Sequence, residues 1–371
     1  MEKSFRMELA GRPLIVETGK MAKQASGAVL VRYGETVVLV TSTASKEARE
    51  GMDFFPLTVD YEEKMYAVGK MPGGFLRREG RPGNSAILNA RLIDRPIRPL
   101  FDKRCRNDIH VMATVLSVDY DNAPELCGML GASASLGISD IPWDGPIAGV
   151  RVGRIDGQFV INPTQEQLKV STLNITVAGS ETAILMVEGG AQEAPEEDVL
   201  DAIMFGHETI KELVAFQKKI IEEVGKPKRT LIFPEIPEEI KTAIYAYAER
   251  PLKEAIFNPD KLTREAHMEE VRKEAEAHFK EIYPENGSDI AECLNHLTKE
   301  IVRHMISVDK IRPDGRALDE IRPISCEVGL LPRVHGSALF TRGQTQALTI
   351  TTLAPMSETQ IIDDLTQETE K

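Results

Sequence analysis

An internal repeat is the feature that most constrains the fold of this chain. Residues 27–36, GAVLVRYGET, match residues 336–345, GSALFTRGQT, at an offset of 309, and Glu17-x-Gly19 matches Glu327-x-Gly329 at an offset of 310. Two copies of one domain, separated by a linker, explain this better than chance. A first copy that needs residues 1–225 leaves room only for the opening hairpins of a second copy before the last residue. We therefore expect an incomplete second core, in a polypeptide that is part of a longer gene product.

The first copy is predicted to mix sheets and helices, which makes the fold class α+β. Alternating apolar residues and turn signals predict hairpins at residues 5–17, 28–43, 147–161 and 173–188, with further strands at 53–61 and 109–118. Helices are expected at 124–138 and at 196–224, the second with acidic residues in its first turn and a Gly and a Pro just after its end.

Strand signals vanish between residues 226 and 308. Helices fit residues 237–248, 263–282 and 288–307, and Pro251, Pro284 and Gly287 separate them. The predicted organisation is therefore a first core over residues 1–225, an all-helical domain over 226–308 and the start of a second core over 309–371.

Composition restricts the classes of function. The 371 residues carry a formal net charge of −13, so binding to nucleic acid must come from a local patch. Apolar runs are too short to span a membrane and the first residues form no secretory signal, which makes the cytoplasm the default compartment and predicts no membrane partner. The four cysteines are scattered without a CxxC pair, so no metal site is predicted, and no nucleotide-binding or hydrolase motif is found.

One such local patch covers residues 73–106, a segment that contains nine basic residues and three acidic ones. Glycines and a proline make its first part a loop. An aromatic ring and guanidinium groups on a loop suit stacking on bases and pairing with phosphates, so Phe75, Arg77, Arg78 and Arg81 are predicted to bind single-stranded nucleic acid. Purely structural contacts between subunits are the alternative for these arginines.

A helix is expected to follow this loop, capped by Ser85 and ending near Phe101. It would place Arg91, Arg95 and Arg98 on one face, at i, i+4 and i+7. These three arginines are candidates either for nucleic-acid contacts or for ordinary ion pairs and interface contacts, and their helical spacing favours the second interpretation.

Two stretches carry a resemblance to a known family. FFPLTVDYEEKMYAVGKMPGGFLRREGRPGNSAILNARLIDRPIRPLF and RPDGRALDEIRPISCEVGLLPRVHGSALFTRGQTQAL are similar to bacterial polynucleotide phosphorylases, and the likeness spans essentially the whole chain. It implies an RNase PH-like core of the ribosomal protein S5 domain 2-like type, then an all-α domain, then the truncated start of a second RNase PH-like core. Phosphate-dependent degradation of single-stranded RNA from its 3′ end to nucleoside diphosphates, in mRNA turnover, is the implied activity.

The resemblance also implies a homotrimeric ring in the cytoplasm, RNA-degradosome proteins as partners, and Mg²⁺ or Mn²⁺ and inorganic phosphate as cofactors. Its RNA-gripping pore loop corresponds to Phe75-Leu76-Arg77-Arg78, with Arg81 beside it; Leu76 departs from a phenylalanine of the family.

The resemblance places the catalytic groups in the second core, beyond Lys371. The comparable positions of the first core are Asn122-Ala123-Pro124 for phosphate and Leu168, Asn174 and Thr176 for metal, and they offer neither a serine-rich turn nor a carboxylate. No catalytic residue and no metal ligand is therefore expected in this chain, and the fragment alone is expected to be inactive. A non-catalytic RNA-binding subunit of an RNase PH-like ring is the alternative function.

Overall fold

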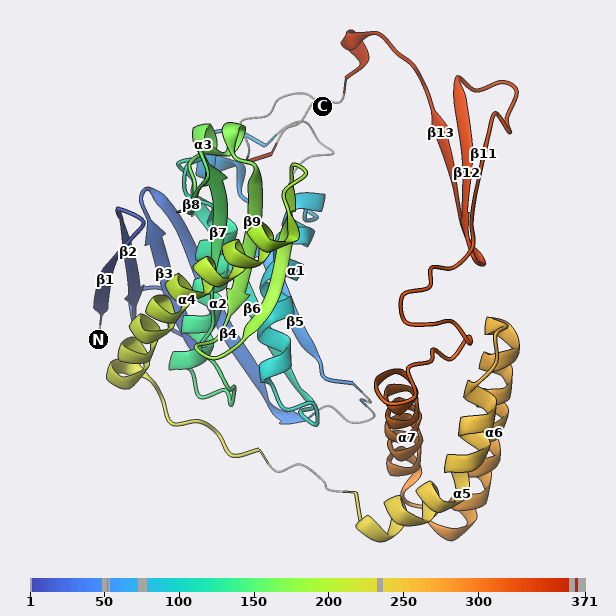
Figure 1. Cartoon of the computed structure of the whole chain (residues 1–371). Coiled ribbons are helices and arrows are strands. Elements are labelled where there is room, and N and C mark those ends of the chain that lie inside the picture. Colours follow the sequence, from blue (N-terminus) through green and yellow to red (C-terminus); the bar gives the residue numbers. More distant parts are fainter. Residues whose placement is uncertain are drawn as a thin grey trace. The chain divides into compact units, whose positions relative to one another are not determined.

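The structure is a computed structural model that describes residues 2–48, 52, 54–72, 79–231, 236–359 and 364–365. The chain forms two compact units: Met1–Phe233 together with Gln360–Lys371, and Pro234–Thr359 (Figure 1). Each unit is described by itself below.

A six-stranded sheet forms one part of the first unit. Its strand order is β1-β2-β3-β4-β6-β5, and all neighbours are antiparallel except β5 and β6. Alternation buries one face, so that Val29, Val31, Val38 and Val40 are all at most 1% exposed. The strands are β1 (Lys3–Leu9), β2 (Arg12–Thr18), β3 (Gly27–Tyr33), β4 (Thr36–Ala48), β5 (Leu57–Glu62) and β6 (Asn107–Ser117).

A four-stranded antiparallel sheet completes the strands of this unit, in the order β10-β9-β7-β8. The predicted hairpin at residues 147–161 is confirmed, and it turns at Asp156-Gly157, with φ angles of 49° and 80° that suit a tight turn. The short helix α3 (Gln165–Val170), which begins with a capping box at Thr164, was not predicted. The strands are β7 (Ala148–Ile155), β8 (Gln158–Ile161), β9 (Leu173–Gly179) and β10 (Ile184–Ala191).

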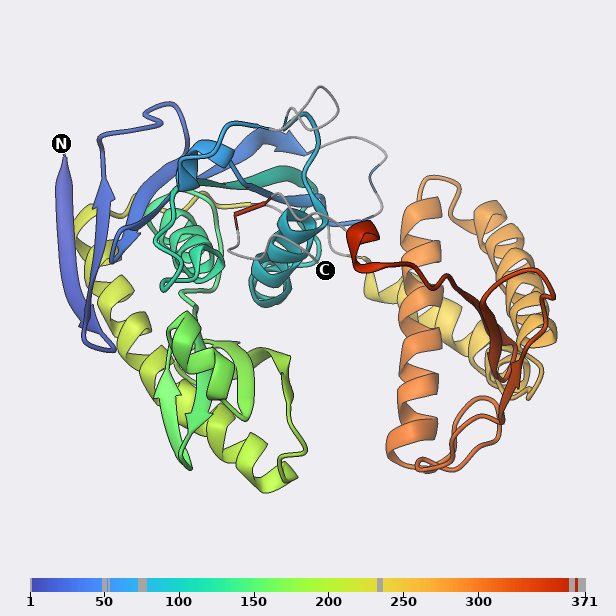
Figure 2. The same cartoon turned by 90° about the horizontal axis from the view of Figure 1, so that it is seen from above.

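Three longer helices pack on these sheets: α1 (Asn84–Ile97), α2 (Pro124–Ile138) and α4 (Glu196–Val224). Figure 2 shows α1 and α2 on the same side of the six-stranded sheet. The helix α2 is buried from Leu126 to Ile138, and it comes close to the sheet because Gly131 has no side chain to hold Val40 away. The bounds predicted for α2 and α4 are confirmed, and so is the α+β class.

The helical part of the second unit consists of α5 (Glu238–Ile256), α6 (Lys261–Ile282) and α7 (Gly287–Ser307) around a core of its own. The predicted end of the first helix at residue 248 is wrong, because α5 continues through Pro251. Proline removes one helical hydrogen bond, but continuing the helix buries Leu252 and Ile256 to 2% and 1% exposure, which offsets that loss.

A three-stranded antiparallel sheet follows, formed by β11 (Ile324–Val328), β12 (Gly336–Arg342) and β13 (Thr345–Thr351). It repeats the β2–β3–β4 sheet in register. Gly336 pairs with Thr351 as Gly27 pairs with Ser42. The turn glycines also match: the N–H of Gly34 donates to the Pro13 carbonyl and the N–H of Gly343 donates to the Pro323 carbonyl. The predicted duplication is therefore confirmed at the level of backbone pairing.

Burial distinguishes the two copies of this sheet. Leu14 and Val31 are 2% and 0% exposed, whereas their counterparts Ile324 and Phe340 are 54% and 43% exposed. The difference arises because α2 covers β3 and β4 of the first copy. Short 3₁₀ helices complete the described secondary structure: η1 (Met65–Val68), η3 (Arg98–Leu100) and η4 (Met356–Glu358).

Candidate nucleic-acid interface

The predicted RNA loop falls only in part on residues that the structure describes. Phe75, Leu76, Arg77 and Arg78 lie outside the described residues. The chain after them is held at Glu79, whose Oε1 accepts the Met65 N–H of η1 at 2.6 Å. Arg81 follows; it is exposed and has no hydrogen bond or ion pair within the described residues. Its guanidinium is therefore available to an anionic ligand.

The helix α1 begins differently from the prediction. Gly83 is the N-cap residue, and Ser85, predicted as the cap, lies inside the first turn and donates to Glu63 Oε1 at 3.0 Å instead. Burial raises the pKa of Glu63, and the hydrogen bond from Ser85 opposes that rise only in part. The Ser85 cap prediction is therefore wrong, because a half-buried carboxylate on the neighbouring segment accepts from the hydroxyl instead. The helix also ends at Ile97, before the η3 turn that leads to Phe101.

The three helical arginines lie in different environments. Arg98 donates to both carboxylate oxygens of Asp94, at 2.9 and 2.7 Å, and to the Leu57 carbonyl at 2.9 Å. Arg95 pairs with Glu188 of β10. Arg91 is exposed and has no ion pair or hydrogen bond in the described part of the chain. Arg95 and Arg98 thus join α1 to its neighbours, and Arg91 keeps an unpaired positive charge.

Arg91 lines a groove of about 330 Å³ between β5 and α1. Pro82, at the end of the predicted RNA loop, lines the same groove, together with the apolar Leu57 and Val59 and the acidic Asp60 and Asp94. An unpaired guanidinium beside apolar side chains can hold a phosphate while a base or ribose rests against the apolar surface. The groove was not found from the sequence, because it requires β5 and α1 to lie side by side.

The N-terminus of α2, the position comparable to a phosphate site, does not fit phosphate. The Asn122 side chain is engaged: it accepts from Arg12 at 2.9 Å and donates to Asp119 at 2.6 Å. Pro124 supplies no N–H at the first helical position. Next in the chain, Glu125 places a carboxylate there that pairs with Arg151 at 2.6 Å. Helix N-termini normally attract anions, but this one is already occupied by the protein's own groups.

The positions comparable to a metal site do not fit a metal either. Leu168 lies in α3, and Asn174 and Thr176 lie in β9, with Thr176 only 8% exposed. None of the three is a carboxylate, and hard cations require several oxygen ligands. Within the residues that the structure describes, no three His, Cys, Asp or Glu side chains are grouped to hold a metal ion.

Sequence reasoning missed the role of Arg12. Its guanidinium lies 4.8 Å from the Tyr33 ring centroid and donates to the carbonyls of Asp121 and Asn162. It thereby ties the first hairpin to the turn before α2. A signal was present, because Arg12-Pro13 recurs as Arg322-Pro323 at the offset of the repeat.

An aromatic pair on the helical part of the second unit was also missed. The Tyr247 and His278 rings stack with centroids 4.7 Å apart and an interplanar angle of 7°, and Tyr247 is 43% exposed. An exposed stacked ring is a surface on which an unpaired base can stack.

Family models match most of the chain. The model described as 3′ exoribonuclease family, domain 1, matches residues 10–142 and 320–369, and domain 2 of the same family matches residues 145–209. The chain therefore has the domains of a 3′ exoribonuclease, and the RNase PH-like fold prediction is confirmed. Between these matches, residues 239–317 match the model described as polyribonucleotide nucleotidyltransferase, RNA binding domain.

Individual relatives agree with these models. Proteins named polyribonucleotide nucleotidyltransferase from Heliobacterium modesticaldum and Syntrophomonas wolfei are both 58% identical, over 99% and 100% of this chain. The one from Geobacillus kaustophilus is 56% identical over 99% of the chain. The chain belongs to the polyribonucleotide nucleotidyltransferase family, as the motifs indicated. It spans about half the length of these relatives, 51–52% of each.

Among solved structures, rice Rrp46 aligns with a TM-score of 0.45 and 14% identity, covering 60% of this chain and 94% of that one. Across the described residues, none of the helices is both long and apolar enough to cross a membrane.

Proposed function

We propose that the whole protein degrades single-stranded RNA from its 3′ end by phosphorolysis, releasing nucleoside diphosphates, and runs the same reaction backwards as polymerisation. The observation that carries this proposal is the 58% identity to proteins named polyribonucleotide nucleotidyltransferase along 99% of the chain. The repeated β-sheet at both ends of the chain supports it, because it agrees with the two places where the domain 1 model matches.

This chain contributes RNA binding rather than chemistry. Phe75, Leu76, Arg77 and Arg78 grip the RNA, and Arg81, which directly precedes the groove-lining Pro82, adds an unpaired guanidinium. The occupied N-terminus of α2 supports a first core without a phosphate site of its own. Inorganic phosphate and Mg²⁺ or Mn²⁺ are bound by residues outside this chain.

The remaining assignments rest on the family alone. The protein acts as a homotrimer in the cytoplasm and meets other RNA-degradation proteins there. The helical part of the second unit adds to RNA binding, a role favoured by the name of its family model and by the exposed Tyr247 ring.

A phosphorolysis assay tests where the chemistry lies. The 371-residue chain should release no nucleoside diphosphates from poly(A) and phosphate and should not polymerise ADP, whereas the protein extended past Lys371 should do both. Phosphate-dependent release by the chain alone would contradict the assignment. An extended protein that binds RNA but remains inactive would favour the second candidate, a non-catalytic RNA-binding ring subunit, which the occupied α2 N-terminus also suits.

A salt titration tests the RNA loop. Replacing Arg77, Arg78 and Arg81 by alanine should weaken binding of labelled oligo(A) and reduce the slope of log Kd against log salt by about 2, because each lost phosphate contact removes about 0.7. The matched control replaces Lys20, Lys23 and Lys46, which are exposed and lie elsewhere. Unchanged RNA affinity together with lost oligomers would instead support a structural role for the three arginines.

A further inference from the structure

Tyr66 is an exposed aromatic residue on the short turn η1. It is 57% exposed, whereas the residues on either side of it, Met65 and Ala67, are 8% and 7% exposed. Because its two neighbours are packed in the core, the tyrosine side chain is left in solvent. Single exposed apolar side chains are common on protein surfaces, so the surroundings of this ring decide whether it has a role.

Backbone hydrogen bonds hold η1 in place. The N–H of Val118, directly after β6, donates to the Ala67 carbonyl at 3.0 Å, and the Gly69 N–H donates to the Tyr66 carbonyl at 3.0 Å. Gly69 ends the turn in the left-handed conformation, with a φ angle of 70°. A fixed backbone therefore presents the Tyr66 ring, and a contact with this ring has to order only two side-chain torsion angles.

The same turn is joined to the predicted RNA loop. Glu79, near the end of that loop, accepts the Met65 N–H at 2.6 Å. Tyr66 directly follows Met65 along the chain. Arg81 lies two residues after Glu79 and has no hydrogen bond or ion pair within the described residues. One hydrogen bond thus connects the segment that carries an exposed ring with the segment that carries a free guanidinium.

The acidic side chains around this turn already have partners. Glu62 pairs with Lys64 at 2.7 Å, and Glu63 accepts from Ser85 at 3.0 Å. Among the described residues 62–70 and 79–81, the cationic Arg81 is the charged side chain left without a partner. The free charge beside the turn therefore attracts a phosphate group.

Tyr66 is exposed even though residues of the second copy lie close to the turn. Leu365 belongs to the core of the first unit and is 7% exposed. The Nζ of Lys70, one residue after the end of the turn at Gly69, donates to the Asp364 carbonyl at 3.1 Å. Tyr66 is 57% exposed with both contacts in place.

We propose that Tyr66 is a stacking site for one base of a single-stranded RNA whose adjacent phosphate binds Arg81. This site rests on the proposed function, because it adds a residue to the RNA interface of the first core. Phe75 is the sole aromatic residue of the predicted RNA loop, so Tyr66 supplies a second ring beside it. Every base has a face that can stack, so the site accepts RNA of any sequence.

Removing the ring tests the stacking. Tyr66→Leu should raise the Kd for labelled oligo(A) roughly tenfold, as expected for the loss of one stacked base. The slope of log Kd against log salt should stay the same, because no phosphate contact is lost. Tyr66→Phe keeps the ring and should bind like the wild type. Fluorescence anisotropy measures each Kd, for the 371-residue chain and for the protein extended past Lys371.

An RNA without bases tests the partner of the ring. An abasic oligonucleotide of the same length keeps the phosphates and offers no base to stack. Tyr66→Leu should therefore leave its Kd unchanged, whereas Arg81→Ala should weaken the binding of both RNAs. A tyrosine that only supports the fold would change the Kd of both RNAs by the same factor, which would overturn the proposal.

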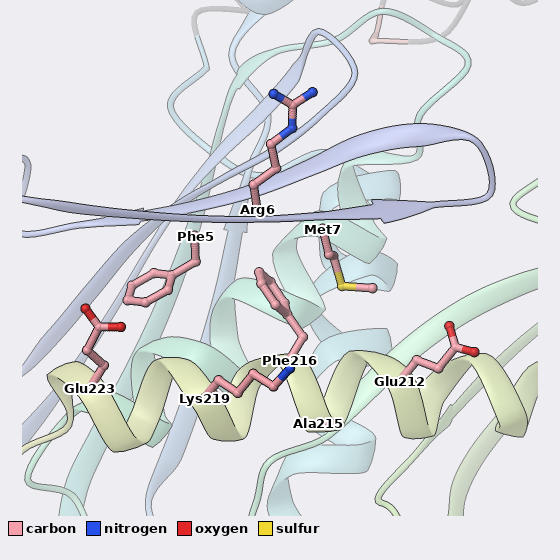
Figure 3. A pocket seen from close by; sticks show the side chains of 8 residues that line it. All are labelled: Phe5, Arg6, Met7, Glu212, Ala215, Phe216, Lys219 and Glu223. Atoms are coloured by element: carbon pink, nitrogen blue, oxygen red, sulfur yellow. The ribbon is translucent and has the colours of Figure 1, made fainter.

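The matched control is Phe216→Leu, which removes a ring elsewhere in the first unit. Phe216 and Phe5 lie between β1 and α4 in a groove of about 540 Å³, which Glu212 and Glu223 also line (Figure 3). This variant should bind both RNAs like the wild type. Unchanged oligo(A) affinity in Tyr66→Leu would overturn the proposal, while affinity lost in the arginine variants of the loop would still support the proposed function. A wild-type chain that binds no RNA would overturn both.

Discussion

Replacing Gly27 by alanine should destabilise the first unit, and the repeat supplies its control. Gly27 begins β3, directly beneath α2. A Cβ at this position would lie 2.0 Å from the Ser135 carbonyl oxygen and 2.9 Å from Ser42 Oγ. At the equivalent position of the second copy, a Cβ on Gly336 would meet only the Thr351 side chain, at 3.4 Å. Alanine at these two equivalent positions should therefore have different effects on stability.

The magnitude follows from the overlap. Because Cβ atoms essentially never approach another heavy atom within 3.0 Å, the Ser135 carbonyl must move by at least about 1 Å. The carbonyl belongs to a helix whose residues Leu126 to Ile138 are all buried, so α2 cannot retreat without losing contacts elsewhere. Overpacking of this kind costs about 3 kcal/mol, at the upper end of its usual range. For a unit of this size the midpoint of thermal unfolding should fall by roughly 6–12 °C.

Trp143 makes the assay specific to the first unit. It is the sole tryptophan of the chain, is 8% exposed, and its Nε1 donates to the Ile97 carbonyl at 3.2 Å. Its fluorescence during heating therefore follows this unit alone. Gly27→Ala should lower the Trp143 midpoint and Gly336→Ala should leave it unchanged. Equal midpoints for Gly27→Ala and the wild type would refute the proposed close packing of β3 against α2.

Two further predictions use the same fluorescence signal. Burial raises the pKa of Glu63, so the folded state holds its proton to a higher pH than the unfolded state and this residue lowers stability as the pH rises. Glu63→Gln should be more stable than the wild type near pH 7, with a difference that shrinks toward pH 4; a difference independent of pH would contradict this. Lys228 donates to the carbonyls of Leu136, Gly137 and Ser139 at 2.8, 2.9 and 2.8 Å. Lys228→Met leaves these carbonyls at the C-terminal end of α2 without their donor and should cost about 2 kcal/mol in a urea titration, whereas an unchanged midpoint would argue against a capping role.

The sequence predicted the long, strongly patterned helices best. The bounds of α2 and α4 were predicted to the residue, because each carries its own start and stop signals. Features that depend on contacts with residues far apart in the sequence were predicted worst. Ser85 donates to Glu63 on another segment instead of capping its own helix. Helix α5 runs through Pro251 because the residues beyond it are buried.

For the candidate site, the sequence likewise predicted the residue types but not their ion-pair partners. Residue types alone marked Arg81, Arg91, Arg95 and Arg98 as cationic candidates, but sequence spacing could not say which of them are paired. Arg98 and Arg95 find Asp94 and Glu188, and the second of these partners lies on β10, far along the chain. Only after those pairs form do Arg81 and Arg91 remain as free guanidinium groups among the described arginines of this patch.

The sequence by itself determined that a β-sheet is duplicated, that a helical segment separates the copies, and which family the motifs belong to. These properties are local or repeated, since they depend on turn residues, alternation and matching strings. The tertiary structure decided which residues of each copy are buried and which are exposed. Leu14 and Ile324 occupy equivalent positions of the two sheets, yet Leu14 is buried and Ile324 is exposed. The neighbouring strands determine the hydrogen bonds of a strand. The elements that pack on the face of the sheet determine its burial.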